Sequence, residues 1–178
     1  MGQYYKPVNL LTREWVYSHG YGNGLKLMEH SYIGNDFVRA VEGLLAPGGR
    51  WHKANIVWAG DYADKERDSR GIPKSSTLYG SVSRYKKIKP RIRKAELRYL
   101  VNHTHQTYVD LKTIVKHEGT WRIHPLPLLT CDGNGRGGGD YHGERMDLVG
   151  AWARCSISME KTAPYGYQII AAPFKELL

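Results

Sequence analysis

The chain has 178 residues, of which 41% are hydrophobic and 24% are charged, and its formal net charge is +9. This length favours a single domain over residues 1–178 with a hydrophobic core of its own. There is no apolar run of about 18 residues, which excludes a membrane-spanning helix. The first residues lack the apolar stretch of a signal peptide, and the two cysteines, Cys131 and Cys155, are too few for a disulfide framework. We therefore expect a cytoplasmic protein with reduced thiols, no cofactor and no membrane contact.

The N-terminal third predicts a hairpin followed by one amphipathic helix. Residues 4–11 and 15–17 have the composition of two strands around a short turn. After a glycine-rich turn at residues 20–24, apolar side chains recur with helical spacing over residues 35–45. An Asn-Asp pair can cap the start of this helix, and a Pro-Gly-Gly run ends it. Residues 54–59 then predict a buried strand.

The rest of the chain alternates polar connections with short apolar segments. Residues 61–81 are polar and predict a long loop. Residues 97–101 and 107–111 predict a second hairpin. We expect residues 123–130 to be extended, because two prolines there oppose a helix and suit a sheet edge. Two further apolar segments predict strands at residues 148–159 and 167–172. Together these elements predict an α+β fold: one domain with a largely antiparallel sheet and one principal amphipathic helix.

Most of the positive charge lies in one segment. Residues 84–98 hold eight basic residues and one acid, so they supply +7 of the net charge. Basic and apolar residues alternate here, and an extended chain would present four cations on one face. Such a ribbon can follow the phosphates of a nucleic acid. The alternative is that lysine and proline protect an exposed sheet edge. The candidate nucleic-acid contacts are Lys87, Lys89, Arg91 and Arg93.

The glycine-rich loop at residues 131–143 is the most unusual segment, since six of its thirteen residues are glycine. Glycine is favoured where the backbone has positive φ or closely approaches another group. The loop matches Gly-x-Gly-x-x-Gly, but it lacks the following helix start that a dinucleotide-binding fold requires. A looser hypothesis is that its backbone N–H groups bind an anion, and the alternative is a plain surface connection. The candidate ligand-binding residues are Gly133, Asn134, Gly135, Arg136, Gly138, Tyr141 and His142.

Acid–base catalysis is a further hypothesis, since it needs a titratable group placed in a pocket. The candidates are His142, Asp140 and His103. Glu29 and His30 would join the first two if the two glycine-rich segments met. A zinc site would need four scattered side chains to converge, so we predict no metal. Those side chains are His103, His105, Cys131 and His142.

Three stretches carry a resemblance that covers most of the chain. The opening Met-Gly-Gln-Tyr-Tyr-Lys, the Gly-Asn-Gly-Leu-Lys-Leu-Met-Glu-His-Ser of residues 22–31 and the Asn-Gly-Arg-Gly-Gly-Gly-Asp-Tyr of residues 134–141 resemble small uncharacterised proteins of bacteria and their phages. The resemblance implies a cytoplasmic bacterial or phage protein, and with it interference with host nucleic acids, nucleotide signals or defence proteins. Because this family has no activity to name, it carries no catalytic residue over.

These observations favour binding of a phosphate-bearing ligand, either a nucleotide or a nucleic acid. One alternative is a metal-independent phosphodiesterase or nucleotide-processing enzyme. Another is a phage-type inhibitor that binds a host or defence protein, using the 13 tyrosines and five tryptophans as interface anchors.

Overall fold

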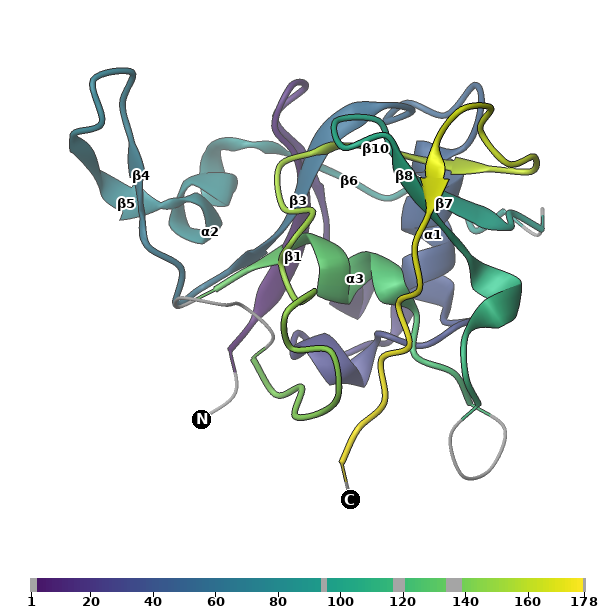
Figure 1. The fold of residues 1–178 in the computed structure, drawn as a ribbon. Helices are drawn as coiled ribbons and strands as arrows, with labels where there is room; N and C mark the ends of the chain where they lie inside the picture. The colour runs from purple at the N-terminus through teal and green to yellow at the C-terminus, as the bar shows by residue number, and fades with distance from the viewer. Residues whose placement is uncertain (1–2, 94–95, 117–120, 134–138, 178) are drawn as a thin grey trace.

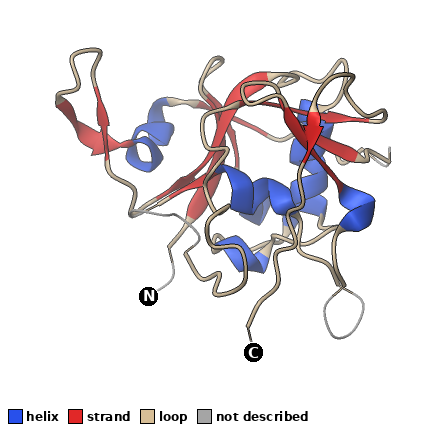
Figure 2. Cartoon of the chain, viewed as in Figure 1, coloured by secondary structure: helices blue, strands red, loops and turns tan. Residues whose placement is uncertain are grey.

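The computed structural model describes residues 3–93, 96–116, 121–133 and 139–177, and it has the predicted α+β fold (Figure 1, Figure 2). One mixed sheet runs through the molecule, and a small two-stranded sheet projects from it. Among the described residues, no helix has the length and apolarity needed to cross a bilayer. The strands are β1 (Tyr5–Asn9), β2 (Glu14–Val16), β3 (Ala54–Gly60), β4 (Lys65–Arg67), β5 (Pro73–Thr77), β6 (Lys86–Ile88), β7 (Tyr99–Asn102), β8 (Thr107–Asp110), β9 (Cys131–Asp132), β10 (Ser156–Glu160) and β11 (Gln168–Ile169). The helices are α1 (Asp36–Leu45), α2 (Leu78–Ser81) and α3 (Pro125–Thr130), with 3₁₀ turns η1 (Ser18–Tyr21), η2 (Leu27–Glu29), η3 (Val82–Arg84) and η4 (Leu111–Thr113).

The larger sheet has the strand order β11-β8-β7-β10-β3-β1-β2-β6, with β9 beside β3. Most of its pairs are antiparallel, whereas β2–β6, β3–β9 and β8–β11 are parallel. Both predicted hairpins are confirmed, as β1–β2 and β7–β8. Their turns contain Arg13 and Gln106, each with a φ of 53°. This left-handed geometry lets a short turn reverse the chain.

The two faces of the sheet carry cores of different size. Successive strand residues point to opposite faces. In β3, Ile56 and Trp58 therefore enter the main core together with residues of α1, whereas Val57 and Ala59 enter a smaller core. The smaller core is completed by apolar side chains of α2 and η3, such as Leu78. α1 and α2 thus lie on opposite faces of the sheet.

The principal helix, α1, lies where the periodicity predicts it. Asn35 is its N-cap, because the side-chain oxygen accepts hydrogen bonds from the N–H groups of Phe37 and Val38 at 2.9 and 3.1 Å. The amide nitrogen of Asn35 donates to Asn23 Oδ1 at 2.6 Å. The cap therefore also ties the first glycine-rich turn to the helix.

Residues 125–130 form the helix α3, so the extended conformation predicted for them is wrong. Pro125 and Pro127 both lie in the first turn, where backbone N–H groups have no partner within the helix. Proline therefore costs no hydrogen bond there, and its fixed φ suits the helix. His124 Nδ1 accepts from the N–H of Leu126 at 3.1 Å, which leaves Nε2 to donate to Glu42 of α1 at 2.8 Å. The start of α3 is thereby capped and joined to α1.

Residues 61–81 are not one long loop, contrary to the prediction. β4 and β5 form an antiparallel hairpin, which projects from the body of the molecule and leads directly into α2 (Figure 1). The polar composition suggested a loop because it provides no apolar face for a strand. An exposed hairpin does not need such a face.

The strands predicted at residues 148–159 and 167–172 are shorter, since only Ser156–Glu160 and Gln168–Ile169 are extended. The turns before β10 donate the N–H groups of Gly150 and Trp152 to the last carbonyls of α3. They therefore cap a helix instead of extending the sheet.

Candidate functional site

The basic segment begins at the edge of the sheet. Its first part is β6, the end strand, which pairs in parallel with β2. In this register Lys87 lies beside Trp15 and Ile88 beside Val16. Ile88 is half-buried against the main core, whereas Lys87 is exposed. Lys87 and Ile88 therefore point to opposite faces as predicted, but β6 ends at Ile88, and Ile92, which was predicted to share the apolar face, is 39% exposed.

Beyond β6 the segment continues over α1 and is fixed there at two points. Tyr21 Oη donates to the carbonyl of Pro90 at 2.5 Å, and the Tyr21 ring packs against Phe37 with a centroid distance of 5.9 Å. Burial raises the pKa of Tyr21 to about 12, so the hydroxyl keeps its proton and remains a donor. Further along, the aliphatic part of Arg93 lies against Gly43 of α1. The path of the exposed cations is thus set by the protein itself.

The four predicted nucleic-acid contacts of this segment are exposed. Lys87 Nζ lies 5.8 Å from the ring centroid of Tyr17, and Lys89 Nζ lies 6.0 Å from that of Tyr21. These distances are near the outer limit of a cation–π contact, so the rings orient the lysines without neutralising them. Within the described chain, none of the four predicted contacts forms a salt bridge. By contrast, Arg98 at the end of the segment is ion-paired, and so are four arginines outside it: Arg50, Arg70, Arg145 and Arg154.

Beside Lys87, the ammonium of Lys6 in β1 lies between the rings of Trp15 in β2 and Tyr79 in α2, and a third ring, Tyr17, directly follows β2. Lys6 Nζ lies 4.7 Å from the ring centroid of Trp15 and 4.0 Å from that of Tyr79. Trp15 meets Tyr17 edge-on at 5.5 Å. All four side chains are half-buried, and we call them the aromatic–lysine row. The sequence analysis missed this row, because its members come from three separate segments. The i, i+2 spacing of Trp15 and Tyr17 in a predicted strand is the signal that could have revealed part of it.

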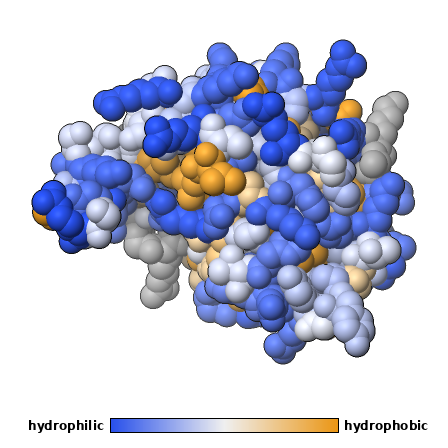
Figure 3. All heavy atoms as spheres, turned by 90° about the horizontal axis from the view of Figure 1, so that it is seen from above, coloured by the Kyte–Doolittle hydropathy of each residue, from blue (hydrophilic) through white to orange (hydrophobic). Residues whose placement is uncertain are grey.

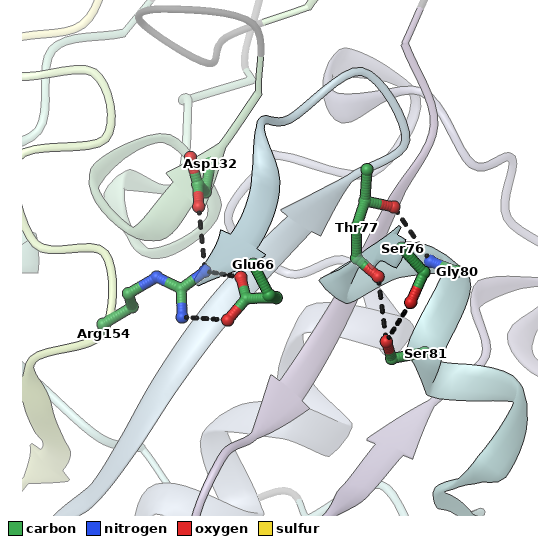
Figure 4. A network of polar contacts seen from close by, with 7 residues as sticks. All are labelled: Glu66, Ser76, Thr77, Gly80, Ser81, Asp132 and Arg154. Atoms are coloured by element: carbon green, nitrogen blue, oxygen red, sulfur yellow. Dashed lines mark hydrogen bonds and ion pairs between the residues drawn. The ribbon is translucent and has the colours of Figure 1, made fainter. Parts of the chain in front are cut away.

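Polar contacts around α2 fix the position of Tyr79. Thr77 Oγ1 accepts from the N–H of Gly80 at 3.1 Å, and Ser81 Oγ donates to the carbonyl of Thr77 at 3.0 Å (Figure 4). Ser76 Oγ lies 2.9 Å from Ser81 Oγ. The Thr77 bond satisfies a helix N–H that has no partner within the helix. These contacts hold the single turn that presents Tyr79.

The strand that carries Trp15 and precedes Tyr17 is anchored by a buried carboxylate. Glu14 accepts from Arg50 Nε at 2.7 Å and from Trp51 Nε1 at 3.0 Å. The hydrogen bond from Arg50 is the main reason that the pKa of Glu14 is lowered to about 2, although burial acts in the opposite direction. Glu14 is therefore ionised at neutral pH, and it ties β2 to the connection between α1 and β3.

The glycine-rich loop is described only at its two ends. Tyr141, which the sequence placed among the ligand-binding residues, is buried. Its Oη donates to the carbonyl of Glu144 at 2.6 Å and accepts from the N–H of Lys175 at 3.1 Å. Burial raises the pKa of Tyr141 to about 12, so this hydroxyl is a neutral group with partners inside the protein. Gly133 is buried, and His142 is exposed. Four predicted ligand-binding residues lie outside the described residues: Asn134, Gly135, Arg136 and Gly138.

The residues that follow the first glycine-rich turn contact the end of the glycine-rich loop, and they do so among carboxylates. The N–H of Met28 donates to Asp140 Oδ1 at 3.0 Å. Glu29, Asp140 and Glu176 line one depression there. Three carboxylates around the same depression disfavour a phosphate group by charge repulsion. His30, which was expected to join this site, is instead fully buried.

The catalytic candidates do not converge. His103 Nε2 lies 2.7 Å from Ser158 Oγ, and its Nδ1 lies 3.1 Å from Tyr167 Oη. Burial lowers the pKa of His103. Ser158 has 0% exposure, so its hydroxyl cannot meet a substrate in this conformation. Among the described contacts, no hydrogen bond or ion pair joins His103 to Asp140 or His142.

The side chains considered for zinc have other partners. His105 Nε2 lies 3.8 Å from Cys155 Sγ, and Cys131 Sγ donates to the carbonyl of Leu128 at 3.2 Å. Both thiols are free and buried. In the part of the chain that the structure describes, no three His, Cys, Asp or Glu side chains are grouped to hold a metal ion.

Comparisons with family models, with curated proteins and with solved structures found no match to this chain. The basic segment and the aromatic–lysine row beside it are therefore the features that bear on function.

Proposed function

We propose that this protein binds the sugar–phosphate backbone of a nucleic acid through the exposed cations of residues 86–93. The observation that supports the proposal is the uneven distribution of ion pairs. Within the described chain these cations lack carboxylate partners, whereas Arg98 binds Asp110 through two bonds of 2.9 and 2.7 Å. Unpaired cations that follow one another along the chain can each contact a phosphate, and they displace the counterions that surround it.

Protection of the sheet edge explains only part of this segment. β6 ends at Ile88, yet exposed cations continue with Lys89, Arg91 and Arg93. A cation beyond the strand shields none of the unpaired N–H or C=O groups of β6. A chain of repeated negative charges would use the whole length of the segment, including the part over α1.

A variant in which Lys87, Lys89, Arg91 and Arg93 are all replaced by Gln tests the proposal. The parent protein should bind a labelled single strand of about 20 nucleotides with an affinity that falls steeply as salt rises. Each phosphate contact contributes about −0.7 to the slope of log affinity against log salt, so the variant's slope should be shallower by roughly 3. Fluorescence anisotropy at a series of salt concentrations measures this slope.

A matched control removes the same number of charges from other exposed positions, so that both variants have the same net charge. The control should keep the parent's slope. Equal slopes in all three proteins, or no binding by the parent at low salt, would contradict the proposal. The control carries Gln in place of Lys112, Lys116, Lys161 and Lys175.

The enzyme alternative lacks comparable support. A phosphodiesterase needs a nucleophile or base that can reach its substrate. Ser158 is buried and His103 is engaged by two partners, while Asp140 accepts from a backbone N–H. Appearance of shortened oligonucleotides during the binding experiment would favour the enzyme instead.

A further inference from the structure

The outer face of the sheet near β6 lies beyond the smaller core. α2 and η3 pack their apolar residues against β1 and β3 and complete the smaller core there. The positions closer to the edge hold the aromatic–lysine row and Lys87, which are half-buried or exposed. Seen from above, the surface is mostly hydrophilic, with an apolar area beside the projecting hairpin and smaller ones elsewhere (Figure 3). That surface offers little to a large apolar partner.

Strand pairing explains why the row forms one surface. Val8 pairs with Trp15, and Trp15 pairs with Lys87. Side chains two residues apart on a strand share a face. Lys6 on β1 and Tyr17, which follows β2 with an extended backbone, therefore lie on the same face as these residues. The rings and ammonium groups of three adjacent strands thus face outward together.

Aromatic side chains with lysines beside them suit a single strand of nucleic acid better than a duplex. The unpaired bases of a single strand expose flat faces that stack on aromatic side chains, while the flanking phosphates contact lysines. A duplex keeps its base faces stacked inside and offers the protein mainly its backbone and groove edges. Resting on the proposed function, we infer that the aromatic–lysine row stacks the unpaired bases of a single-stranded nucleic acid whose backbone follows Lys87 to Arg93.

The environment of the Lys6 ammonium supports binding of a single strand by the aromatic–lysine row. Its ammonium is held over two rings, at 4.7 and 4.0 Å from their centroids. Burial lowers the pKa of Lys6, although the charge of Asp61 acts in the opposite direction. The ammonium has therefore lost part of its hydration, and a phosphate oxygen would give it a new partner. Trp15, Tyr17 and Tyr79 all keep exposed surface that a base could contact.

Paired substitutions at two positions test the inference. Tyr17→Leu and Tyr79→Leu remove a stacking ring and keep an apolar side chain, while Tyr17→Phe and Tyr79→Phe keep the ring. The probes are oligothymidylate of about 12 nucleotides and a mixed-sequence duplex of about 12 base pairs. The parent should prefer the single strand. Each Leu variant should bind it roughly tenfold more weakly with an unchanged salt slope, and each Phe variant should bind like the parent.

The slope of log affinity against log salt distinguishes base stacking, which is inferred here, from the backbone contact of the proposed function. Equal binding of single strand and duplex by the parent, or unchanged binding by both Leu variants, overturns stacking while the slope still supports backbone contact. Absence of any salt-dependent binding overturns both. Thermal unfolding of every variant confirms that it folds, and if Tyr79→Leu fails to fold, Tyr17→Leu decides the result.

Discussion

The protonation state of His30 follows from its two neighbours. The indole nitrogen of Trp58 can only donate, and it lies 3.0 Å from His30 Nε2. The imidazole proton therefore sits on Nδ1, which donates to the carbonyl of Gly24 at 3.2 Å. Burial lowers the pKa of His30 to about 4, although the bond to Gly24 acts in the opposite direction. A second proton would break the bond from Trp58 and place a charge in the core.

Folding stability should therefore fall as the pH drops from about 6.5 to about 4, because the unfolded chain binds a proton that folded His30 does not. Between pH 7 and pH 5 this residue should account for a loss of roughly 2 kcal/mol. Urea unfolding of the parent and of His30→Gln, whose amide oxygen can accept from Trp58, measures the effect. The variant should lose less stability over this interval. Equal losses in the two proteins would show that His30 does not carry the pH dependence.

The β4–β5 hairpin is tied to the main sheet through Arg154. Arg154 Nη1 donates to Glu66 Oε2 at 3.3 Å, and Nη2 donates to Asp132 Oδ2 at 3.2 Å and to Glu66 Oε1 (Figure 4). Glu66 belongs to β4 and Asp132 to β9. The guanidinium thus joins an element that would be marginally stable alone to the body of the protein.

Arg154→Ala should loosen the hairpin and leave the core intact. Limited proteolysis within residues 61–77 should become several-fold faster, whereas global stability should change by only about 1 kcal/mol, because the ion pair is partly exposed. Arg145→Ala is a matched control, since Arg145 also has positive φ and pairs with an exposed carboxylate outside the hairpin. If both variants are cleaved at the same rate, Arg154 does not restrain the hairpin.

Elements with a complete local signal were predictable from the sequence. α1 has an apolar stripe and a cap, and the β1–β2 and β7–β8 hairpins have short turns. α3 was misread because Pro125 and Pro127 were judged as if they lay within a helix, whereas they lie in its first turn. The parallel pairing of β2 with β6 joins distant segments, and no local pattern encodes it.

The candidate site was likewise predictable only where its signal lies within one short stretch of sequence. Its exposed cations are neighbours in the sequence, so charge alone located them. The aromatic–lysine row was not predictable, because Lys6, Trp15 and Tyr79 come together only when β1, β2 and α2 assemble around the smaller core. A local pattern shows which charges lie on one strand, but the register of neighbouring strands decides what stands beside them.

The whole molecule carries its charge unevenly, since residues 84–98 supply +7 of the net charge of +9. A protein adsorbs to a charged surface through its most charged face, because the Debye length of about 10 Å at 0.1 M salt limits each charge to a local effect. Retention on a cation-exchange column should therefore depend on where charges are removed. The variant with four Gln residues in the basic segment should elute at lower salt than the control with four Gln residues elsewhere, although their net charges are equal. Both should elute before the parent. Elution of the two variants at the same salt concentration would mean that the cations of residues 87–93 do not form a dominant charged face, and the backbone contacts proposed for them would lose their electrostatic basis.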